Sequence, residues 1–428
     1  MTDDSTFAVI GAGPSGLAVA KALKDKGISY VQFDANEDLG GNWLNGVYES
    51  VHIISSKKTT EFSDYPMPQS YPDFPSGTQM IAYLRDFAET FGLRANMQFK
   101  CKVTAVTPID GDRWQVQING NESRVFKGVI VCNGHHWDKR YPTYPGKFDG
   151  ELMHSKDYKT PEQLRGKSVL VIGGGNSACD LASEAARVGN RCGLSLRRGY
   201  WFLPKTIFGT PITEIFSVSW PVWAQRLVLQ TLLKVMVGDY KKFGLPQPDH
   251  KIFERHPTVN SELLHYLRHG RITPYPDIQK FDGKVVEFTD GRKEEFDTIV
   301  CATGFNLSFP FLPKNLVDIQ NGVLQVYGGC AFASVKNLYV FGTLQPRYGF
   351  GPLMTPAAVL LARLIRLQDE MVLPVGLVLK KCGDRPAATP LVDPIQTLRQ
   401  LKSFERQSKL LPSIERQLRK RMQMSASH

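Results

Sequence analysis

Paired cysteines are missing from this sequence. Its 428 residues hold seven cysteines, an odd number, and none of them forms a Cys-x-x-Cys pair. A disulfide framework, a zinc site and a disulfide-reductase centre are therefore not expected, and a reducing compartment is favoured. The first residues, MTDDSTFAVIGAG, also lack the pattern of a signal peptide. We expect a cytoplasmic protein without a bound metal ion.

Long apolar runs are missing as well. The nearest candidate, residues 215–238, is interrupted by Pro221, Arg226 and Lys234, so a membrane-spanning helix is not expected. This segment predicts either a core helix or a helical pair that docks on a membrane surface or forms a homodimer. The tail SIERQLRKRMQM predicts a basic helix, which presents a solvated face or touches acidic lipids.

Acidic residues are in the minority. The chain holds 52 Lys and Arg against 41 Asp and Glu, which gives a net charge of +11. Such a surplus attracts anions, namely dinucleotides, acidic lipids or nucleic acid. The sequence shows no RNA- or DNA-binding motif, so nucleic acid is the weakest of these partners. The apolar share of 42% and the charged share of 22% are ordinary for a globular protein, and the length predicts two or three domains.

The segment FAVIGAGPSGLAVAKAL near the N-terminus combines a short apolar strand, a Gly-x-Gly-x-x-Gly turn and a helix. This is the context that a dinucleotide-binding loop requires. Gly11 allows the tight turn, Gly13 lets the backbone approach a pyrophosphate, and Gly16 lets the helix pack close to the strand. The next strand ends at an acid that can bind both hydroxyls of an adenosine ribose. The residues expected to contact this nucleotide are Gly11, Gly13, Pro14, Ser15, Gly16 and Asp34.

A further glycine turn, LGGNW at residues 39–43, follows this acid. A Gly-Gly-x-Trp turn at this place is typical of FAD proteins with two dinucleotide domains, so FAD is the expected first nucleotide. The alternative is an ordinary glycine turn. Gly41, Asn42 and Trp43 are the contacts that the FAD interpretation predicts.

The segment GKSVLVIGGGNSACDLASEAARVG, residues 166–189, repeats the strand–turn–helix pattern as Gly-x-Gly-x-x-Ala. The following strand ends in two arginines, at the place where an acid would bind a ribose 2′-hydroxyl. Arginine there accommodates a 2′-phosphate, which favours NADPH over NADH. A pair of solvated surface arginines is the alternative. The residues expected at this second nucleotide are Gly173, Gly175, Asn176, Ser177, Ala178, Asp180, Arg197 and Arg198.

Two apolar strands, 129–134 and 298–305, end in small residues and predict crossings between domains. We therefore expect an α/β fold with two Rossmann-like dinucleotide-binding domains, in which a discontinuous FAD domain holds an inserted NADP domain. Residues 337–346 predict a late strand that returns to the flavin and brings Gln345 to it. The expected parts are 1–160, the first part of the FAD domain; 161–290, the NADP domain with an apolar helical insertion around 206–245; and 291–428, the second part of the FAD domain with the basic tail.

Between the two glycine loops, residues 148–159 read FxGxxxHxxxYK, with Phe148, Gly150, His154, Tyr158 and Lys159 at the defining positions. This pattern resembles the signature of flavin-containing monooxygenases. The segments VYESVHIISSKKTTEFSDYPMP, HPTVNSELLHYLRHGRI and DTIVCATGF resemble other parts of the same family. The resemblance therefore covers most of the chain, from about residue 7 to residue 350.

The resemblance implies FAD and NADP(H) as cofactors and a small-molecule amine or sulfide, together with O2, as substrates. In the family, NADPH reduces FAD, the reduced flavin forms a C4a-hydroperoxide with O2, and a soft nitrogen or sulfur takes the distal oxygen. Tyr158 stands where Baeyer–Villiger relatives usually carry Trp, which favours the heteroatom-oxygenating branch. Baeyer–Villiger oxygenation of ketones and an NADPH oxidase or reductase with poor oxygen transfer are the alternatives. No catalytic side chain is assigned, and His154 is expected to order the linker.

One position departs from the family pattern. The family usually has Asn before Ser-x-Lys, between flavin and nicotinamide, whereas this chain has Ile54 followed by Ser55. We expect both residues at the flavin. Isoleucine donates no hydrogen bond, so the departure predicts a shorter-lived oxygenated flavin but leaves nucleotide binding unaffected.

Overall fold

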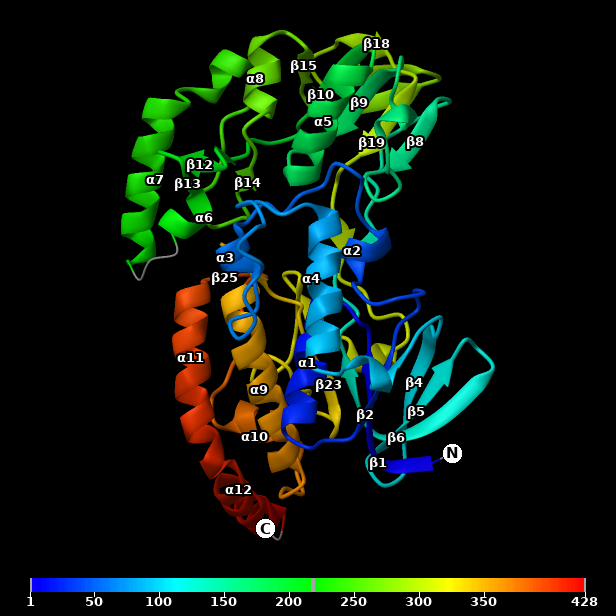
Figure 1. Cartoon of the computed structure of the whole chain (residues 1–428), viewed down its shortest axis with the longest axis vertical. Coiled ribbons are helices and arrows are strands. Elements are labelled where there is room, and N and C mark those ends of the chain that lie inside the picture. Colours follow the sequence, from blue (N-terminus) through cyan, green and yellow to red (C-terminus); the bar gives the residue numbers. More distant parts are fainter. Residues whose placement is uncertain (1, 217–219, 427–428) are drawn as a thin grey trace.

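The computed structural model describes residues 2–216 and 220–426 and consists of two lobes along the longest axis of the molecule (Figure 1). Each lobe is built around one largely parallel sheet with helices against it. The first sheet lies in the lower lobe of Figure 1 and the second in the upper lobe. The fold is therefore mixed α/β with parallel sheets, as the sequence predicts.

The first sheet has the strand order β3-β2-β1-β6-β5-β4, with β23 beside β6. Strands β3, β2, β1, β6 and β23 run parallel, whereas β4 and β5 form an antiparallel meander on β6. Phe7 and Val9 face one apolar core and Ala8 and Ile10 face another, because both faces of the sheet are covered. The strands are β1 (Thr2–Ile10), β2 (Tyr30–Phe33), β3 (Met97–Gln98), β4 (Val103–Ile109), β5 (Arg113–Ile118), β6 (Glu122–Val131) and β23 (Leu338–Val340).

The second sheet is parallel throughout and has the order β15-β10-β9-β19-β8. Helix α5 (Asn176–Val188) shares the apolar core on one face, and an antiparallel sheet of β16, β17 and β18 shares the core on the other. The strands of the second sheet are β8 (Glu151–His154), β9 (Ser168–Ile172), β10 (Arg191–Ser195), β15 (Ile272–Tyr275) and β19 (Thr298–Cys301). The antiparallel sheet consists of β16 (Ile278–Asp282), β17 (Val285–Phe288) and β18 (Lys293–Glu295).

The chain crosses from the first sheet to the second after β6 and returns after β19. The boundaries expected at residues 160 and 290 both fall within the second sheet, because its strand β8 comes before residue 160 and its strand β19 comes after residue 290. Strand β8 has only four residues, so its periodicity could not be told from that of a linker. The chain passes between the two sheets outward of these expected boundaries, within 132–150 and 302–337.

Helices α1, α4 and α9 pack against one another in the first lobe. Helix α4 begins with a capping box, in which the Ser76 hydroxyl accepts from the Gln79 amide and the Gln79 side chain accepts from the Ser76 amide. The helices of this lobe are α1 (Pro14–Asp25), α2 (Asn42–Asn45), α3 (Lys57–Thr60), α4 (Gly77–Thr90), α9 (Gly351–Gln368), α10 (Val375–Lys381), α11 (Pro394–Gln407) and α12 (Leu411–Ala426).

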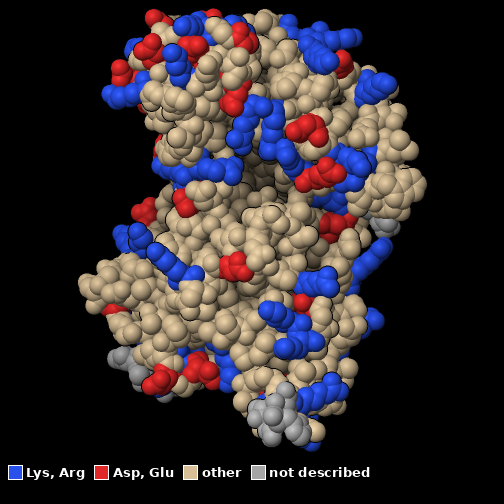
Figure 2. Space-filling model, turned by 180° about the vertical axis from the view of Figure 1, so that it is seen from behind, with Lys and Arg blue, Asp and Glu red and all other residues tan. Residues whose placement is uncertain are grey.

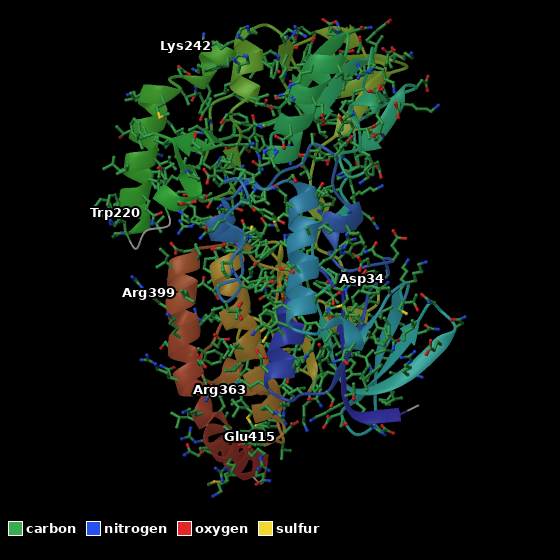
Figure 3. The ribbon with its side chains drawn as sticks, viewed as in Figure 1. Asp34, Trp220, Lys242, Arg363, Arg399 and Glu415 are labelled. Atoms are coloured by element: carbon green, nitrogen blue, oxygen red, sulfur yellow. The ribbon has the colours of Figure 1, made fainter. Side chains whose placement is uncertain are left out.

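The expected apolar insertion lies on the second lobe. It contains a β12·β13 hairpin and helices α6 and α7, with Trp220 on the surface just before α7 (Figure 3). Residues 217–219 of this segment lie outside the described residues. No helix in the described part of the chain is long and apolar enough to cross a membrane. The elements are β12 (Thr206–Ile207), β13 (Thr210–Pro211), α6 (Ile212–Ile215) and α7 (Val222–Met236), and helix α8 (Leu263–Arg268) follows.

The basic tail packs on the first lobe as α12. Its buried Glu415 (Figure 3) accepts from the amides of Val372 and Leu373 at 3.3 and 3.2 Å and pairs with Arg419 at 2.8 Å. The outer face of α12 is basic and exposed, so the predicted solvated face is present. The remaining short strands are β7 (Asp138–Lys139), β11 (Phe202–Leu203), β14 (Thr258–Val259), β20 (Phe305–Asn306), β21 (Ile319–Gln320), β22 (Val323–Leu324), β24 (Gln345–Pro346) and β25 (Leu391–Val392).

Candidate functional site

The first glycine loop lies between β1 and α1, where the neighbouring strand β6 leaves the first sheet. Gly11 has φ +104°, and a Cβ there would lie 2.4 Å from the Cys132 carbonyl oxygen. A Cβ on Gly16 would lie 2.0 Å from the Gly11 carbonyl oxygen. Both positions therefore require glycine. The loop sits at a switch point of the strand order, the place where open α/β sheets bind ligands.

Asp34 follows the last residue of β2 and is buried beside this loop (Figure 3). Its Oδ2 accepts from the Ala12 amide at 2.6 Å, and its Oδ1 accepts from the backbone and side-chain nitrogens of Asn36 at 2.8 and 2.9 Å. The carboxylate thus ties the loop to β2. Since a carboxylate offers about four acceptor positions, capacity remains for one ribose hydroxyl.

The Gly-Gly turn and the late strand close on the same loop. Gly41 has φ +57°, and a Cβ there would lie 2.9 Å from the Gly13 Cα. Gly342, which follows β23, has φ +81°, and a Cβ there would lie 2.1 Å from the Ser15 Oγ. Residues far apart in sequence therefore meet around the start of α1. Gln345 lies beyond Gly342, in β24, and its backbone amide donates to the Pro390 carbonyl group at 2.8 Å.

Two histidines that the sequence reasoning missed lie directly after β6. Both ring nitrogens of His135 are buried without a well-formed hydrogen bond among the described residues, and burial lowers the pKa of this ring more than the nearby Gly342 backbone raises it. Desolvation also lowers the pKa of His136, although the residue as a whole is exposed. The sequence could have indicated these histidines by their position, because polar residues that follow the carboxyl end of a parallel strand mark a binding site.

The second glycine loop repeats the first, between β9 and α5. Gly173 has φ +124°, and a Cβ there would lie 2.4 Å from the Ala302 carbonyl oxygen, beside the end of β19. A Cβ on Gly175 would meet no atom within 4 Å. The backbone at the start of α5 therefore stands open to a ligand, and Ala178 is buried beneath it. Free N–H groups at a helix N-terminus favour an anion there.

The expected second-nucleotide residues divide between this loop and the junction of the lobes. Arg197 is exposed just beyond β10, and Arg198 stacks on the Tyr200 ring at 5.3 Å. The Asn176 Oδ1 accepts from the Val259 amide at 2.8 Å, which anchors β14 to the loop. Asp180 lies one helical turn below Asn176 and points into the junction, where Tyr48 donates to its Oδ2 at 2.8 Å. Ser177 lies near the same Tyr48 hydroxyl.

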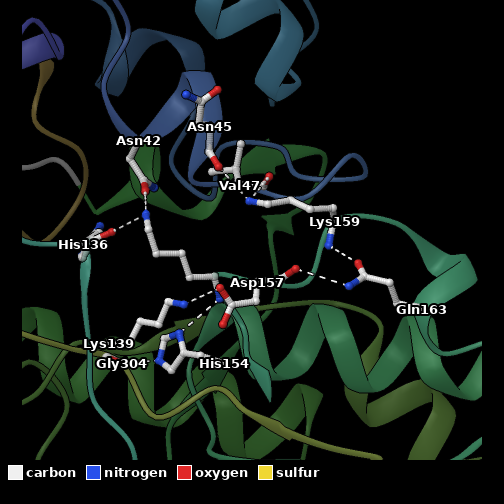
Figure 4. A network of polar contacts seen from close by, with 11 residues as sticks. Asn42, Asn45, Val47, His136, Lys139, His154, Asp157, Lys159, Gln163 and Gly304 are labelled. Atoms are coloured by element: carbon white, nitrogen blue, oxygen red, sulfur yellow. Dashed lines mark hydrogen bonds and ion pairs between the residues drawn. The ribbon is translucent and has the colours of Figure 1, made fainter. Parts of the chain in front are cut away.

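His154 lies in the segment between the two loops (Figure 4). Its Nε2 donates to the Gly304 carbonyl group at 3.0 Å, and its Nδ1 accepts from the Lys156 amide at 3.1 Å. Both nitrogens are therefore engaged by backbone groups, and the ring is neutral with its proton on Nε2. These two contacts fix the ring between Gly304 and Lys156, and the linker-ordering role of His154 stays a prediction.

The other signature residues connect the lobes or fill the core. Lys159 donates to the carbonyl groups of Asn45 and Val47 at 2.8 and 3.2 Å (Figure 4), and Tyr158 donates to Glu184 at 2.7 Å. Lys156, which the sequence reasoning did not single out, donates to the Asn42 Oδ1 at 3.0 Å. Phe148 packs in the core beneath the second sheet, and a Cβ on Gly150 would lie 2.6 Å from its ring.

Ile54 is partly exposed on the first lobe, next to the junction. The neighbouring Ser55 hydroxyl shares a hydrogen bond of 2.6 Å with the Thr60 hydroxyl. The Ser56 amide donates to Thr213 of the second lobe at 3.1 Å. A hollow opens between the lobes on the face turned away from Figure 1, with Lys and Arg side chains around it (Figure 2).

Comparison with known proteins decides the family. Residues 4–359 match the model of a family described as flavin-binding monooxygenase-like. The chain belongs to this family. It is 34% identical to flavin-containing monooxygenase 5 of Oryctolagus cuniculus over 88% of the chain and 78% of the relative. It is also 34% identical to dimethylaniline monooxygenase [N-oxide-forming] 2 of Rattus norvegicus, over 75% of the chain but only 65% of that relative.

Solved structures share the fold of this flavin-binding monooxygenase. A flavin-containing monooxygenase from Stenotrophomonas maltophilia has a TM-score of 0.65 at 23% identity, covering 85% of this chain and 98% of the other. Cyclohexanone monooxygenase in a closed crystal form has a TM-score of 0.66 at 19% identity, covering 86% and 85%. At these identities the likeness shows the fold alone. The class predicted from the sequence, a flavoprotein monooxygenase, is confirmed by the family match.

The residues of this flavin-binding monooxygenase fit two dinucleotides. Around the first loop, the buried ring nitrogens of His135 have no well-formed hydrogen bond within the part of the chain that the structure describes, and the backbone at Gly13 has no side chain to obstruct a pyrophosphate. At the second loop, Gly175 faces open space and the buried Arg198 Nε lacks a partner among the described residues. Asp180 is the exception, because its two carboxylate oxygens are already bonded to Tyr48 and Asn260 at the junction. It follows Gly175 by five residues, and a helix turns a side chain at that distance away from its N-terminal end.

Acid is expected to destabilise this flavin-binding monooxygenase partly through His154. Burial lowers the pKa of His154 below the value near 6.5 of an unfolded chain. Below that pH the unfolded chain binds a proton that the folded chain refuses, so the free energy of unfolding falls, by at most about 1.4 kcal/mol per pH unit. Urea unfolding between pH 7 and 5 should therefore depend less on pH in His154→Gln, which keeps a donor for Gly304. The exposed His269→Gln is the control, and an equal slope in His154→Gln and wild type would contradict the prediction.

Proposed function

We propose that this protein is an NADPH-dependent FAD monooxygenase that oxygenates soft nucleophilic nitrogen or sulfur in small molecules. The balanced reaction converts an amine or sulfide, O2, NADPH and H⁺ into an N-oxide or S-oxide, water and NADP⁺. The observation that carries the proposal is the pair of glycine loops at the switch points of two parallel sheets, joined by the signature segment. The 34% identity to an N-oxide-forming monooxygenase supports the nitrogen specificity.

In this proposal the lobes are two Rossmann-like domains. The FAD domain is discontinuous and consists of the residues before 132 and after 337, whereas the NADP domain is inserted between them. The contacts of Lys156 and Lys159 with 42–47 support the arrangement, because they bring the first nucleotide turn against the second lobe. The strand order of both sheets supports it as well.

Each residue group has a role that follows from its chemistry. When bound, FAD would accept a hydride from NADPH and activate O2. The start of α1 and Asp34 would hold the adenosine half of the first nucleotide, with Gly41, Asn42 and Trp43 beside it. The start of α5 and Arg197 would hold the second nucleotide and its 2′-phosphate. The chain itself supplies orientation and exclusion of water rather than a general base.

Tyr158 bears on the choice of substrate only indirectly. Its hydroxyl is buried against Glu184 and does not line the hollow between the lobes. A tryptophan at this position would lose that hydrogen bond and repack the junction. An influence of Tyr158 on the reaction would therefore act through the packing against α5 and not through contact with a substrate.

The function is tested on the purified protein in two steps. Flavin released by heat should run chromatographically as FAD, because the first loop and Asp34 suit the adenosine half that FMN lacks. NADPH oxidation is then followed with dimethylaniline, a methyl sulfide and a cyclic ketone, while product and hydrogen peroxide are both quantified. N-oxide or sulfoxide supports the proposal, lactone supports Baeyer–Villiger chemistry, and peroxide alone supports an NADPH oxidase.

Ile54→Asn is expected to lower the hydrogen peroxide released per NADPH oxidised. Ile54 can exclude water but cannot donate a hydrogen bond, and Ser55 is already bonded to Thr60. One regained hydrogen bond is worth about 1 kcal/mol, or roughly fivefold if it acts on the barrier to peroxide loss. This position is also the observation that favours an NADPH oxidase as the second candidate function.

The control for this prediction is Ile54→Leu, which keeps an apolar side chain of the same volume. Both variants are compared by peroxide yield with and without substrate. A peroxide yield in Ile54→Asn equal to or above that of wild type would contradict the prediction. It would mean that the apolar side chain protects the flavin by excluding water.

The membrane contact, the oligomeric state and the cellular location of the enzyme stay predictions. Trp223, Leu227 and Val235 of α7 are 69%, 60% and 80% exposed, which supports a peripheral membrane contact or a homodimer through residues 215–238. The basic face of α12 supports a contact with acidic lipids. A cytoplasmic location and the absence of nucleic-acid partners likewise rest on the sequence. A vesicle flotation assay and light scattering would test the first two.

A further inference from the structure

One turn of the first lobe is clasped to α5 of the second. Tyr48 donates to the Asp180 Oδ2 at 2.8 Å, and the Ser50 hydroxyl donates to the Glu184 Oε2 at 3.2 Å. Asp180 and Glu184 are one helical turn apart and share one face of α5. His52 completes the contact with a hydrogen bond to Lys205. We call this contact the α5 clasp.

The α5 clasp is anchored firmly on the first lobe. His52 forms a β-bridge with Ser76 in front of α4, and the Gly77 amide donates to the Val51 carbonyl group at 2.9 Å. The Tyr48 ring, by contrast, is buried in the apolar core of the second lobe, 5.9 Å from the ring of Tyr158. The turn is therefore tied to the first lobe by its backbone and to the second lobe by its side chains.

Asp180 joins the clasp to the rest of the second lobe. The Asn260 Nδ2 donates to the Asp180 Oδ1 at 2.7 Å, while the Asn260 Oδ1 accepts from the amides of Glu262 and Leu263 in front of α8. Both carboxylate oxygens of this partly buried side chain are thus engaged. Desolvation raises the pKa of Asp180 and the Tyr48 hydrogen bond opposes the rise, so Tyr48, together with Asn260, supplies the hydrogen bonds that this carboxylate needs.

We propose that Tyr48 and Asp180 are positioning residues that set the distance between the two nucleotides for hydride transfer. The inference rests on the proposed function. Asp180 lies five residues after Gly175, so their distance along α5 is about 7.5 Å at 1.5 Å per residue. A rotation of α5 about the clasp would displace the second nucleotide against the first. Hydride donors and acceptors must approach within roughly 3–3.5 Å, and a 1 Å error can cost on the order of a hundredfold in rate.

Other contacts keep the lobes together when the clasp is weakened. Lys58 pairs with Glu214 at 3.2 Å, and Lys159 binds the carbonyl groups of Asn45 and Val47. Loss of one hydroxyl at Tyr48 therefore changes the angle between the lobes without separating them. This is why the effect is expected in the rate of hydride transfer rather than in folding.

The test compares Tyr48→Phe with Tyr240→Phe. The buried Tyr240 hydroxyl bonds only to the backbone of Phe202 within the second lobe, at 3.1 and 3.2 Å, so its loss is matched in chemistry but does not cross the junction. Flavin reduction is followed anaerobically over a range of NADPH concentrations. The limiting rate should fall about tenfold or more in Tyr48→Phe, with the Kd for NADPH unchanged, and should stay at the wild-type value in Tyr240→Phe.

A second readout needs no NADPH. Amide hydrogen exchange over residues 48–52 and α5 should be faster in Tyr48→Phe than in wild type, because the clasp opens more often. Asp180→Asn keeps an oxygen acceptor for Tyr48 and should lose less rate, and adding it to Tyr48→Phe should cost less than the sum of the two.

Two results would overturn the proposal. If a variant binds NADPH more weakly but keeps the wild-type limiting rate, Tyr48 or Asp180 is part of the nucleotide site. If Tyr48→Phe keeps the wild-type Kd, limiting rate and amide exchange, the clasp is dispensable. Wild-type protein that binds FAD but is not reduced by NADPH would instead refute the proposed function.

Discussion

Replacing Gly13 by alanine is expected to remove the bound flavin and to leave the fold intact. Gly13 has φ −79°, a conformation that alanine also adopts, and its Cβ would lie 3.4 Å from the Gly41 Cα, which is an ordinary contact. The added methyl group would, however, occupy the surface on which a pyrophosphate rests. Overpacking of this kind costs about 1–3 kcal/mol, or roughly fivefold to a hundredfold in affinity. Flavin absorbance after gel filtration and titration of the apoprotein with FAD measure the loss.

The matched control is Gly175→Ala, at the same position of the second loop. Gly175 has φ −80°, and its Cβ would meet no atom within 4 Å. We expect this variant to keep its flavin and to lose affinity for NADPH, whereas Gly13→Ala does the reverse. Thermal unfolding of both apoproteins should match that of wild type. Retention of wild-type flavin affinity in Gly13→Ala would place the flavin elsewhere.

Arg197→Ala is expected to abolish the preference for NADPH over NADH. Arg197 is exposed directly beyond β10, where the ribose of a nucleotide on the second loop would lie. Each charge-assisted hydrogen bond to the 2′-phosphate is worth about 1.5–3 kcal/mol, or on the order of tenfold to a hundredfold in kcat/KM at about 1.4 kcal/mol per factor of ten. Initial rates with both nucleotides give the ratio, which should fall because KM rises for NADPH and hardly changes for NADH.

The control for this prediction is Arg165→Ala. Arg165 is an exposed arginine of the same lobe, paired with Glu162 near the start of β9, at the edge of the sheet opposite the loop. It should leave the ratio unchanged. Equal losses with NADPH and NADH in Arg197→Ala would mean that the arginine only supports the structure of the second lobe.

The two glycine loops could be read from the sequence because their requirements are local. Gly11 and Gly173 have positive φ angles, and neighbouring backbone leaves no room for a Cβ at either. These steric requirements allow only glycine at each position, and the glycines recur at a constant spacing in both loops, so they are visible as a sequence motif. The same holds for Arg197, whose place after β10 follows from the strand–turn–helix–strand order.

Strand β8 could not be predicted from a local motif, because the residues that make it a strand lie in a distant part of the chain. Its four residues pair with β19, which follows it by more than a hundred residues. A short edge strand is defined by the partner that it meets, and its own period carries too little information. This is why the boundaries expected at 160 and 290 fall within the second sheet.

The sequence by itself determined the family and showed both glycine loops and the departure from the family pattern at Ile54. Tertiary structure alone decided which way Asp180 faces and what surrounds His135. A helix offers several faces, and only the packing of the lobes selected the face of α5 that meets Tyr48. Hydrogen bonds across such a junction join residues 132 positions apart, and no local pattern records them, because each partner is an ordinary polar residue until the chain has folded.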